Sequence, residues 1–554
     1  MDLKKTTLAL LLLTQCWLAT LAQQTVGLFL NDSLSQNGFT LFSNNKTTYL
    51  VDNCGRTVRT WQSDFTTNSG LYLLENGNLL RSCRIGGTFN AGGVGGRIEL
   101  FSWEGDLLWA YNYASDDYHQ HHDICPLPNG NFLLLAWERR TQPEAIQAGR
   151  NPDLLTPDGL WPEKIVEVEM VGSNGINVVW EWRLWDHLVQ DFDPDKDNFG
   201  SVAGHPERVN INFVGNIGGP GIADWIHANS LAYHPDLDQI AVTSRTFSEI
   251  WIIDHSTTTT EAAGSTGGNA GKGGDLLYRW GNPQAYDRGT PADQILWGPH
   301  YANWIPAGYP NEGKLLVFNN GFNRPGNNFS SVDMWEAPLG DQGYLIEPGL
   351  AFGPSGPAWS YTAAGFYAGT MSGAHALPNG NVFICQSTSS RFFEITPNHQ
   401  IVWEYISPSS GFGPIAQGQT NNSVTFRATR YPASYPAFEG KYLSPGSPVE
   451  LNPLPSDCTI FDGSPTSTNV RAAIFLEGVR LRNNPVGRSL FIENLPGNEL
   501  VLEIRNAVGT SAKRTTVRGL QSEVDVSGLP KGFYILQLFD TKTRNHFNLK
   551  FIKN

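Results

Sequence analysis

Three histidines occupy one position of an internal strand–turn–strand repeat. His122, His227 and His300 each lie seven residues before the turn of their unit, at positions 129, 234 and 307. Equivalent positions on the innermost strands of a ring of repeats converge near the axis of the ring. We therefore expect the three imidazoles to meet at one working site.

An arginine adds to the chemistry that these histidines offer. Arg245 follows the strand that begins near His227, and a buried arginine needs either a carboxylate or an anionic ligand. Three histidines can hold zinc or copper, but a cation beside a metal ion is costly unless an anion lies between them. Transfer of an anionic group fits better, because a neutral imidazole can attack it while cations stabilise it. An Arg–Asp bridge between repeats is the structural alternative for Arg245.

The remaining histidines do not share this phase of the repeat. His375 lies four residues before its turn at Asn379, so its assignment to the site has less support, although it could still line a central channel. We expect solvated or capping roles, in loops, turns or the C-terminal segment, for His119, His121, His187, His205, His255, His399 and His546. Clustered imidazoles repel one another's charge, so some of those in the site should stay neutral near pH 7.

Two half-motifs alternate along the chain and predict the elements that position these residues. The first is a strand, a turn and a strand ending in tryptophan, with copies that end at Trp61, Trp109, Trp180, Trp280, Trp359 and Trp403. The second is a strand, a tight turn and a strand, at residues 73–80, 127–133 and 377–383, with looser copies at 231–242, 304–318 and 424–431. Gly, Asn or Asp at the turns is the chemistry that hairpins need.

Each pair of half-motifs makes a four-stranded sheet, which cannot bury both of its faces alone. A ring of six such sheets can, so we predict an all-β fold with a six-bladed β-propeller over residues 23–443. The repeat starts on an outer half and ends on an inner half, so the N-terminal strands should complete the last blade. An open run of hairpins or a sandwich is the alternative.

The two ends of the chain differ from the repeat. Residues 1–22 have a basic start and an apolar run, which predicts a signal peptide. Residues 444–477 are rich in Pro, Ser and Asp and predict a linker. Residues 478–554 contain short strands that alternate apolar and polar side chains, so we expect a small immunoglobulin-like β-sandwich there.

The composition excludes several classes of partner. The 554 residues are too many for one ordinary core, which agrees with one large repeat domain and a smaller one. The net charge is −14 and the chain has no basic cluster, so a nucleic-acid partner is not expected. After the leader, no run is long enough to span a membrane.

Five cysteines remain after the leader, an odd number whose spacings match no zinc pattern. They are Cys54, Cys83, Cys125, Cys385 and Cys458. One disulfide could form after export, but the sequence alone does not pair the cysteines, and buried free thiols are the alternative.

Two glycine-rich segments fall short of the ligand-binding motifs that they resemble. Residues 267–272 lack the first glycine of a phosphate loop, and Gly273 stands where Ser or Thr is needed. Residues 92–96 are interpreted as a hairpin loop, because no helix follows that could support dinucleotide binding.

At the site residues the sequence resembles the bacterial arylsulfate sulfotransferases. The matching segments, in family order, are residues 121–123, 224–230, 244–245, 298–305 and 318–321, with Arg324. The resemblance runs through most of residues 37–445. It implies a six-bladed propeller that moves a sulfuryl group from an aryl sulfate to a phenolic acceptor, without a nucleotide donor and with neither cofactor nor metal.

The resemblance also implies roles for individual residues. His300 would be the nucleophile that becomes transiently sulfated, and His227 would act as acid and base on the phenol oxygens. His122 would assist, and Arg245 would clamp the sulfate oxygens. Asn229 and Arg324 are further substrate-binding candidates.

Three features depart from the family pattern. The better-known periplasmic members have an additional N-terminal domain, whereas this chain enters the repeat soon after its leader. Their nucleophile typically follows glutamine, where this chain has Pro299. Inserted loops at 138–165 and 185–224 could reshape the entrance to the pocket, so the resemblance supports a shared site better than a shared substrate.

The last 75 or so residues resemble the C-terminal sorting domain of type IX secretion cargo. The matching segments are Asn484 with Pro485, residues 506–509, residues 529–535 and residues 549–553. This resemblance implies recognition by the type IX secretion machinery, export across the outer membrane of a Gram-negative bacterium to the cell surface or medium, and later removal of the domain. A carbohydrate-binding or immunoglobulin-like appendage is the alternative.

The sequence therefore supports three hypotheses of function. The first is an enzyme that transfers a sulfuryl group between phenolic compounds through His300. The second is a secreted propeller that binds an anionic or sulfated ligand without chemistry. The third is a metalloprotein that uses the three histidines.

Overall fold

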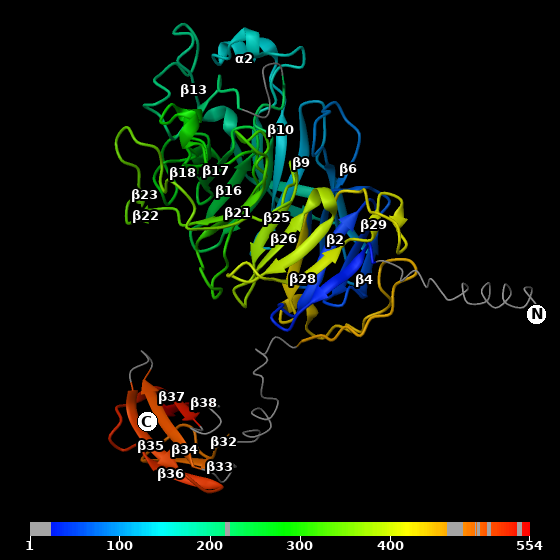
Figure 1. The fold of residues 1–554 in the computed structure, drawn as a ribbon. Coiled ribbons are helices and arrows are strands. Elements are labelled where there is room, and N and C mark those ends of the chain that lie inside the picture. Colours follow the sequence, from blue (N-terminus) through cyan, green and yellow to red (C-terminus); the bar gives the residue numbers. More distant parts are fainter. Residues whose placement is uncertain are drawn as a thin grey trace, which may run out of the picture. The chain divides into compact units, whose positions relative to one another are not determined.

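The computed structural model describes residues 24–215, 222–461, 480–493, 495, 499–506, 511–539 and 546–554 (Figure 1). The expected signal peptide at 1–22 and most of the expected linker lie outside these residues. The chain divides into two compact units, one ending at Asp462 and one comprising Gly463–Asn554. The first unit therefore extends beyond position 444, where the sequence predicted the linker to begin.

The described residues are nearly all β-structure, as the half-motifs predict. The two α-helices are short, α2 at Gln142–Gln147 and α3 at Thr259–Ala262. The 3-10 turns are Pro152–Leu154, Leu184–Asp186, Pro283–Tyr286, Pro291–Asp293, Ser387–Ser389 and Pro436–Phe438. Among the described residues no helix has the length and apolar character needed to cross a membrane.

Six antiparallel sheets of four or more strands make up the described part of the first unit. The first sheet contains β5 (Thr67–Leu73), β6 (Leu79–Arg84), β7 (Gly96–Phe101) and β8 (Leu107–Asn112). The second contains β9 (Tyr118–Pro126), β10 (Phe132–Glu138), β11 (Glu163–Val171) and β12 (Gly175–Arg183). The third contains β15 (Ala228–His234), β16 (Gln239–Ser244), β17 (Glu249–Asp254) and β18 (Tyr278–Trp280). The others are β19 (His300–Trp304), β20 (Leu315–Asn319), β21 (Ser331–Trp335) and β24 (Trp359–Tyr361); β25 (Gly373–Ala376), β26 (Val382–Gln386), β27 (Arg391–Ile395), β28 (Ile401–Ile406) and β1 (Gly27–Asn31); and β31 (Ala428–Pro432), β2 (Gly38–Asn44), β3 (Thr47–Asp52) and β4 (Thr57–Gln62). Short strand pairs are β13 (Leu188–Val189) with β14 (Val209–Asn210), β22 (Leu339–Gly340) with β23 (Gly343–Tyr344), and β29 (Ser409–Ser410) with β30 (Gly413–Pro414).

Successive sheets contact one another in a closed cycle, four of the contacts being between their first strands. Strand β5 contacts β9, β9 contacts β15, β15 contacts β19 and β19 contacts β25. Strand β26 then contacts β31, and β2, which pairs with β31, contacts β5 again. Each of the six sheets therefore contacts the sheet before it and the sheet after it.

The N-terminal strands complete the last sheet, as the order of the half-motifs predicts. Strand β2 pairs with β31 in an antiparallel register in which Thr40 faces Arg430, and the blue strands in Figure 1 lie beside the yellow ones. The structure also contains a strand that the half-motifs do not predict, since β1 pairs with the outer edge of β28. The ends of the repeat region are therefore joined by two sets of strand pairs.

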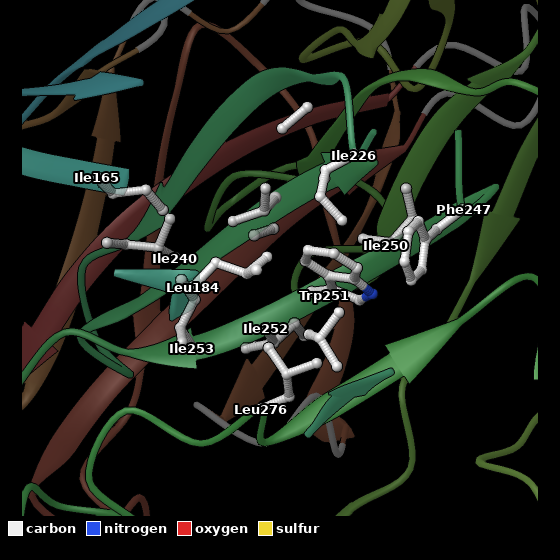
Figure 2. Packing of buried hydrophobic residues seen from close by; sticks show 14 of the residues in the cluster. Ile165, Leu184, Ile226, Ile240, Phe247, Ile250, Trp251, Ile252, Ile253 and Leu276 are labelled. Atoms are coloured by element: carbon white, nitrogen blue, oxygen red, sulfur yellow. The ribbon is translucent and has the colours of Figure 1, made fainter. Parts of the chain in front are cut away.

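The core beside the third sheet is a dense aliphatic and aromatic cluster (Figure 2). Ile165 on β11 and Ile240 on β16 belong to it, and so do Trp251 on β17 and Ile226. Ile226 is fully buried and immediately precedes His227. Because its side chain is fixed in close-packed surroundings, the backbone that carries His227 has little freedom to move.

A disulfide fixes the end of the first unit. Cys54 is bonded to Cys458, 404 residues later, and Asn31 donates a side-chain hydrogen bond to the carbonyl of Thr459. The three other cysteines of the described chain, Cys83, Cys125 and Cys385, are buried free thiols. The five cysteines that follow the leader thus form one disulfide and leave three buried free thiols.

The second unit has its own core between two antiparallel sheets. One sheet contains β32 (Arg480–Leu481), β33 (Ser489–Glu493) and β36 (Gln521–Asp525), and the other contains β34 (Leu500–Asn506), β35 (Ser511–Val517), β37 (Gly532–Phe539) and β38 (His546–Lys553). Alternate residues of β33 are buried, so Leu490 and Ile492 enter the core with Leu502 and Leu536. The predicted alternation of half-buried strands is present, while the immunoglobulin-like topology stays a prediction.

The disulfide gives a first testable prediction. Replacing Cys458 by serine should lower the free energy of unfolding of the first unit by about 2–4 kcal/mol, because the cross-link restricts the unfolded chain. The measurement is a thermal melt of the first unit with and without a reducing agent. Under reducing conditions the wild type should melt with the variant, and a difference that persists there would contradict the explanation.

Candidate functional site

His122, His227 and His300 border one cavity of about 380 Å³. His122 is on β9, His227 immediately precedes β15 and His300 begins β19, so three neighbouring sheets each supply one imidazole. The ring centroids of His122 and His227 are 4.7 Å apart, with the rings at 77° to each other. Polar side chains and one aromatic ring complete much of the wall, among them Asn68, Arg84, Thr370 and Phe426.

Irregular strand pairing aims these side chains. The register shifts beside all three histidines, between Leu134 and Ala136, between Ala228 and Ser230, and between His300 and Asn303. His122 and His227 have left-handed backbone conformations, with φ of 47° and 50°. In the third sheet the left-handed residue is Tyr301, at 56°, so His300 is offset by one residue from the other two. Bulges of this kind redirect a side chain out of the regular strand alternation.

Two glycines cover the imidazoles of His122 and His227. A Cβ atom on Gly93 would lie 2.0 Å from a carbon of the His122 ring, and one on Gly92 would lie 3.2 Å from the His227 ring. The carbonyl of Gly93 accepts hydrogen bonds from the backbone N–H of His122 and from Asn68 Nδ2. The loop at 92–96 is thus more than a hairpin connection, because its bare backbone closes over the site.

Hydrogen bonds fix the protonated nitrogen of His300. Asn320 Oδ1 lies 2.7 Å from His300 Nδ1, and Asn320 Nδ2 donates to the carbonyls of Ala368 and Met371. The amide oxygen must therefore accept, which places the hydrogen on Nδ1 of His300. His300 Nε2 carries the lone pair and accepts a hydrogen bond from the Met371 N–H at 3.1 Å.

Burial, together with the positive charge of Arg245, holds the pKa of His300 well below its usual value. Burial and the neighbouring His227 and His121 likewise hold the pKa of His122 well below its usual value. Both rings are therefore neutral near pH 7, as repulsion within a cluster of imidazoles predicts. A neutral imidazole with a free lone pair at Nε2 is a nucleophile.

His227 is backed by a carboxylate. Its Nδ1 lies 2.6 Å from Asp224 Oδ2, while Trp137 Nε1 donates to Asp224 Oδ1 at 2.9 Å. Burial opposes ionisation of Asp224, but the charge and the hydrogen bond of His227 outweigh it and lower the pKa of this carboxyl. An imidazole paired with an ionised carboxylate can take up and release a proton at its other nitrogen.

His122 is backed by a second imidazole. His121 Nδ1 lies 2.9 Å from His122 Nδ1, and His121 Nε2 lies 2.6 Å from Glu163 Oε2. His121 is fully buried, so the expectation of a solvated or capping role for it was wrong. His119 is fully buried too, so a solvated role is wrong for it. His187 is also fully buried, but it is the C-cap residue of the 3-10 turn Leu184–Asp186, which agrees with the expected capping role.

Arg245 lies close enough to the cavity to act on its histidines but does not border it. Its guanidinium is over the ring of Phe322, 5.4 Å from the centroid, and its buried Nε has no hydrogen-bond partner. Among the described residues no carboxylate forms an ion pair with it, so the alternative of an Arg–Asp bridge was wrong. A half-buried guanidinium that forms no ion pair with a carboxylate can bind an anionic ligand.

The two further substrate-binding candidates also lie outside the cavity wall. Asn229 is fully buried and donates through Nδ2 to the carbonyl of Pro299, so it holds the residue before His300. Arg324 stacks on Phe329 at 4.1 Å and has two buried guanidinium nitrogens without partners. His375 is bonded to the backbone of Arg430 and is likewise not part of the cavity wall.

Several residues of the site were not singled out from the sequence. Asp224 and Asn320 lie within the matching segments, three residues before His227 and two after Phe318, and a search for hydrogen-bond partners there could have found them. Glu163 lies in a segment interpreted as an inserted loop and carries no such signal. Phe426 belongs to the weakest copy of the second half-motif, and the structure alone places it at the cavity.

Among the described residues no three histidine, cysteine or acidic side chains come together as a group that could hold a metal ion. In each of the three site histidines, Nδ1 faces another side chain, which is Asn320, Asp224 or His121. The geometry therefore gives the metalloprotein hypothesis no support.

The sequence profile of the arylsulfotransferase (ASST) family matches residues 28–409. The match covers more than half of the chain, so the chain belongs to the arylsulfotransferase family. No curated protein sequence matches the chain significantly.

Solved structures show only distant likenesses. A protein of unknown function from Bacteroides caccae is 12% identical, with 72% of this chain and 99% of that chain covered and a TM-score of 0.37. The hydrazine synthase of Kuenenia stuttgartiensis is also 12% identical, with 63% and 77% covered and a TM-score of 0.31. Scores this low support no conclusion about function.

The covering loop gives a second prediction. Replacing Gly93 by alanine should destabilise the first unit by about 1–3 kcal/mol more than replacing Gly130, because the new methyl group overlaps the His122 ring. Gly130 is the matched control, since its φ of 89° is also left-handed and nothing lies within 4 Å of its Cβ position. Thermal melts of the two variants measure the difference, and equal losses would show that the backbone conformation alone matters.

Proposed function

We propose that the protein transfers a sulfuryl group from an aryl sulfate to a phenolic acceptor through a sulfated His300, without a nucleotide donor. The observation that carries the proposal is the fixed tautomer of His300, whose neutral ring borders the cavity with its lone pair on Nε2. Membership of the arylsulfotransferase family supports the same reaction.

In the first half of the reaction, His300 Nε2 attacks the sulfur atom of the donor. The N–S bond forms as the S–O bond to the aryl group breaks, and the released phenolate oxygen takes the proton that His227 carries. The hydrogen bond between His300 Nδ1 and Asn320 Oδ1 persists, and it stabilises the positive charge that the sulfated ring acquires. The weak hydrogen bond from the Met371 N–H has to break before the attack.

In the second half, the acceptor phenol gives its proton to His227 and its oxygen attacks the same sulfur atom. The N–S bond breaks, the lone pair returns to His300 Nε2, and the new aryl sulfate leaves. Asp224 stabilises the positive charge that His227 regains in this half, so the proton released by the acceptor is the one that the next donor needs.

Arg245 stabilises the anionic group throughout the transfer. The sulfuryl oxygens carry negative charge in the donor and in the product, and the unpaired guanidinium supplies the missing countercharge from close behind the cavity. Arg324 and Asn229 act at a greater distance, the first as a second cation and the second by holding Pro299.

We also propose that the six sheets of the first unit are the blades of a β-propeller, which the closed cycle of strand contacts supports. The second unit would serve as a sorting domain recognised by the type IX secretion machinery. The protein would then act outside a Gram-negative cell. Loss of export after deletion of the second unit, with the first unit retained in the periplasm, is the result expected of that assignment.

The test of the transfer reaction replaces His300 by alanine. Wild-type protein incubated with an aryl sulfate should release phenol in a burst, and its intact mass should increase by one sulfuryl group. The variant should lose the added mass and lower turnover on the order of 10³-fold or more, since it lacks the nucleophile.

His375→Ala is the matched control, because His375 is a half-buried histidine of the same unit that does not border the cavity. Peptide mapping should place the modification on His300 in the wild type. A wild type that turns over no donor in a broad panel, or a modification retained by the His300 variant, would overturn the proposal.

The low pKa of His300 predicts the pH dependence of the first half of the reaction. Attack needs the neutral ring, so a lowered pKa keeps the protein active as the pH falls below the ordinary histidine range. Arg245→Gln removes the positive charge but not the burial, so the acid limb of kcat/KM should move upward in pH, and kcat/KM itself should drop about 10²–10³-fold. An acid limb that does not move would contradict the electrostatic role of Arg245.

A further inference from the structure

A buried chain of three ionisable side chains ends at the cavity. Glu163 at the start of β11 is hydrogen-bonded to His121 on β9, which is hydrogen-bonded to His122. All three are at most 2% exposed. His122 borders the cavity and uses Nδ1 within the chain, so Nε2 is the nitrogen left for a substrate.

The bond between His121 and His122 joins two Nδ1 atoms, so one of these nitrogens carries a hydrogen and the other a lone pair. If Glu163 is ionised, it accepts from His121 Nε2–H, His121 Nδ1 accepts from His122 Nδ1–H, and the lone pair of His122 is on Nε2. If Glu163 is protonated, every donor and acceptor is reversed, and His122 Nε2 carries the hydrogen. The state of the carboxyl thus fixes the tautomer of an imidazole two groups away.

The surroundings of Glu163 favour the protonated carboxyl. Burial and the charge of Asp224 raise the pKa of Glu163 well above its usual range, although the Ala228 N–H and His227 act the other way. Burial lowers the pKa of His121 to about 3, so the proton stays on the carboxyl and does not charge the ring. The remaining groups that act on the chain are His300 and Arg245, which lower the pKa of His122.

The substrate chemistry asks for the same state. This step rests on the proposed function, in which the cavity holds a sulfuryl group. Sulfuryl oxygens only accept hydrogen bonds, so a lone pair on His122 Nε2 would repel them, whereas an N–H would bind them. His122 must therefore present a hydrogen, and the chain supplies it only when Glu163 is protonated.

We propose that Glu163, acting through His121, holds His122 as a neutral imidazole that donates its Nε2–H to a sulfuryl oxygen. Glu163 and His121 are positioning residues, and His122 is a fixed hydrogen-bond donor. His227 differs because Asp224 backs it directly with a carboxylate, so it is the histidine that exchanges protons. Trp137 contacts both the chain that ends at His122 and the pair of His227 with Asp224. Its ring stacks on His121 with the centroids 3.9 Å apart, and its Nε1 donates to Asp224.

Glu163 also connects the chain that ends at His122 to the backbone beside His227. Its Oε1 accepts a hydrogen bond from the backbone N–H of Ala228, the residue after His227. A glutamine at this position can keep both contacts, because its amide nitrogen donates to His121 and its oxygen accepts from Ala228. Such a glutamine imitates the protonated carboxyl but cannot ionise.

The first experiment reads the tautomer directly. Protein labelled with ¹⁵N-histidine, with the His122 signals assigned from a His122→Asn variant, should show hydrogen on Nε2 and a lone pair on Nδ1 at neutral pH. In Glu163→Gln this pattern should persist at every pH at which the protein is folded, whereas in the wild type it should reverse as the pH rises and Glu163 ionises. A lone pair on Nε2 of His122 in the wild type at neutral pH would overturn the proposal.

The second experiment compares rates of the first half of the reaction, measured as phenol release without an acceptor. Glu163→Ala breaks the chain and should lower the rate on the order of 10²-fold, and Glu163→Gln should lose less than Glu163→Ala. Glu167→Gln is the control on the same strand, since Glu167 is a buried carboxylate bonded to His255 but lies outside the site. Equal losses in the alanine and glutamine variants would overturn the proposal.

The two proposals fail separately. The tautomer of His122 is measured without turnover, so it can disagree with the chain even if His300 is sulfated normally. Conversely, an inactive wild type with the predicted tautomer would reject sulfuryl transfer and leave the role of Glu163 in setting the imidazole intact.

Discussion

The pairing of β31 with β2 is the contact on which the site depends. It joins residues about 390 positions apart, as in the hydrogen bond from Arg430 to Thr40. The residues just before β31 then reach the histidines, where the ring centroid of Phe426 lies 6.0 Å from that of His122 and 6.1 Å from that of His300. Arg427 pairs there with Asp123, the neighbour of His122. Without the strand pairing the cavity lacks part of its wall and the buried Asp123 loses its ion pair with Arg427, which costs about 3–5 kcal/mol.

The electrostatics of the site follow from its enclosure. Burial keeps His122 and His300 neutral, and the neighbouring groups include the hydrogen-bonded pair of His227 with Asp224, Arg245 without a carboxylate in an ion pair, and Arg84 in the cavity wall. The two arginines give the surroundings of the cavity an excess of positive charge, so an anionic group is the ligand that completes the site. The same enclosure makes each hydrogen-bond direction important, because a misdirected donor on a buried side chain has no water to bond to instead.

Much of the fold could be predicted from the sequence, because several copies of each half-motif show the same order of strands and turns. The tryptophans that end the first half-motif lie in the outer strands of the sheets, and the phase of the second half-motif brought three distant histidines to one cavity. The one-residue offset at His300 could not be predicted, since it depends on which residue of a bulge takes the left-handed conformation.

The partners of these histidines escaped prediction for a different reason. Glu163 and His121 are joined by a hydrogen bond between residues 42 positions apart, on strands β11 and β9, which are not adjacent in their sheet. Asp224 and Glu163 are carboxylates of the site that the sequence analysis did not single out. The pairing of Cys54 with Cys458 spans 404 residues, and no spacing rule relates the two.

The left-handed backbone at His122 and His227 limits what evolution can place there. Most residues lose about 1–2 kcal/mol in that conformation, whereas asparagine, aspartate, histidine and glycine tolerate it. A descendant that abandoned the chemistry would keep its fold most easily by drifting to asparagine or glycine at these two positions. Position 300, which is not left-handed, has no such restriction, so the three histidines would leave different traces in the sequences of inactive relatives.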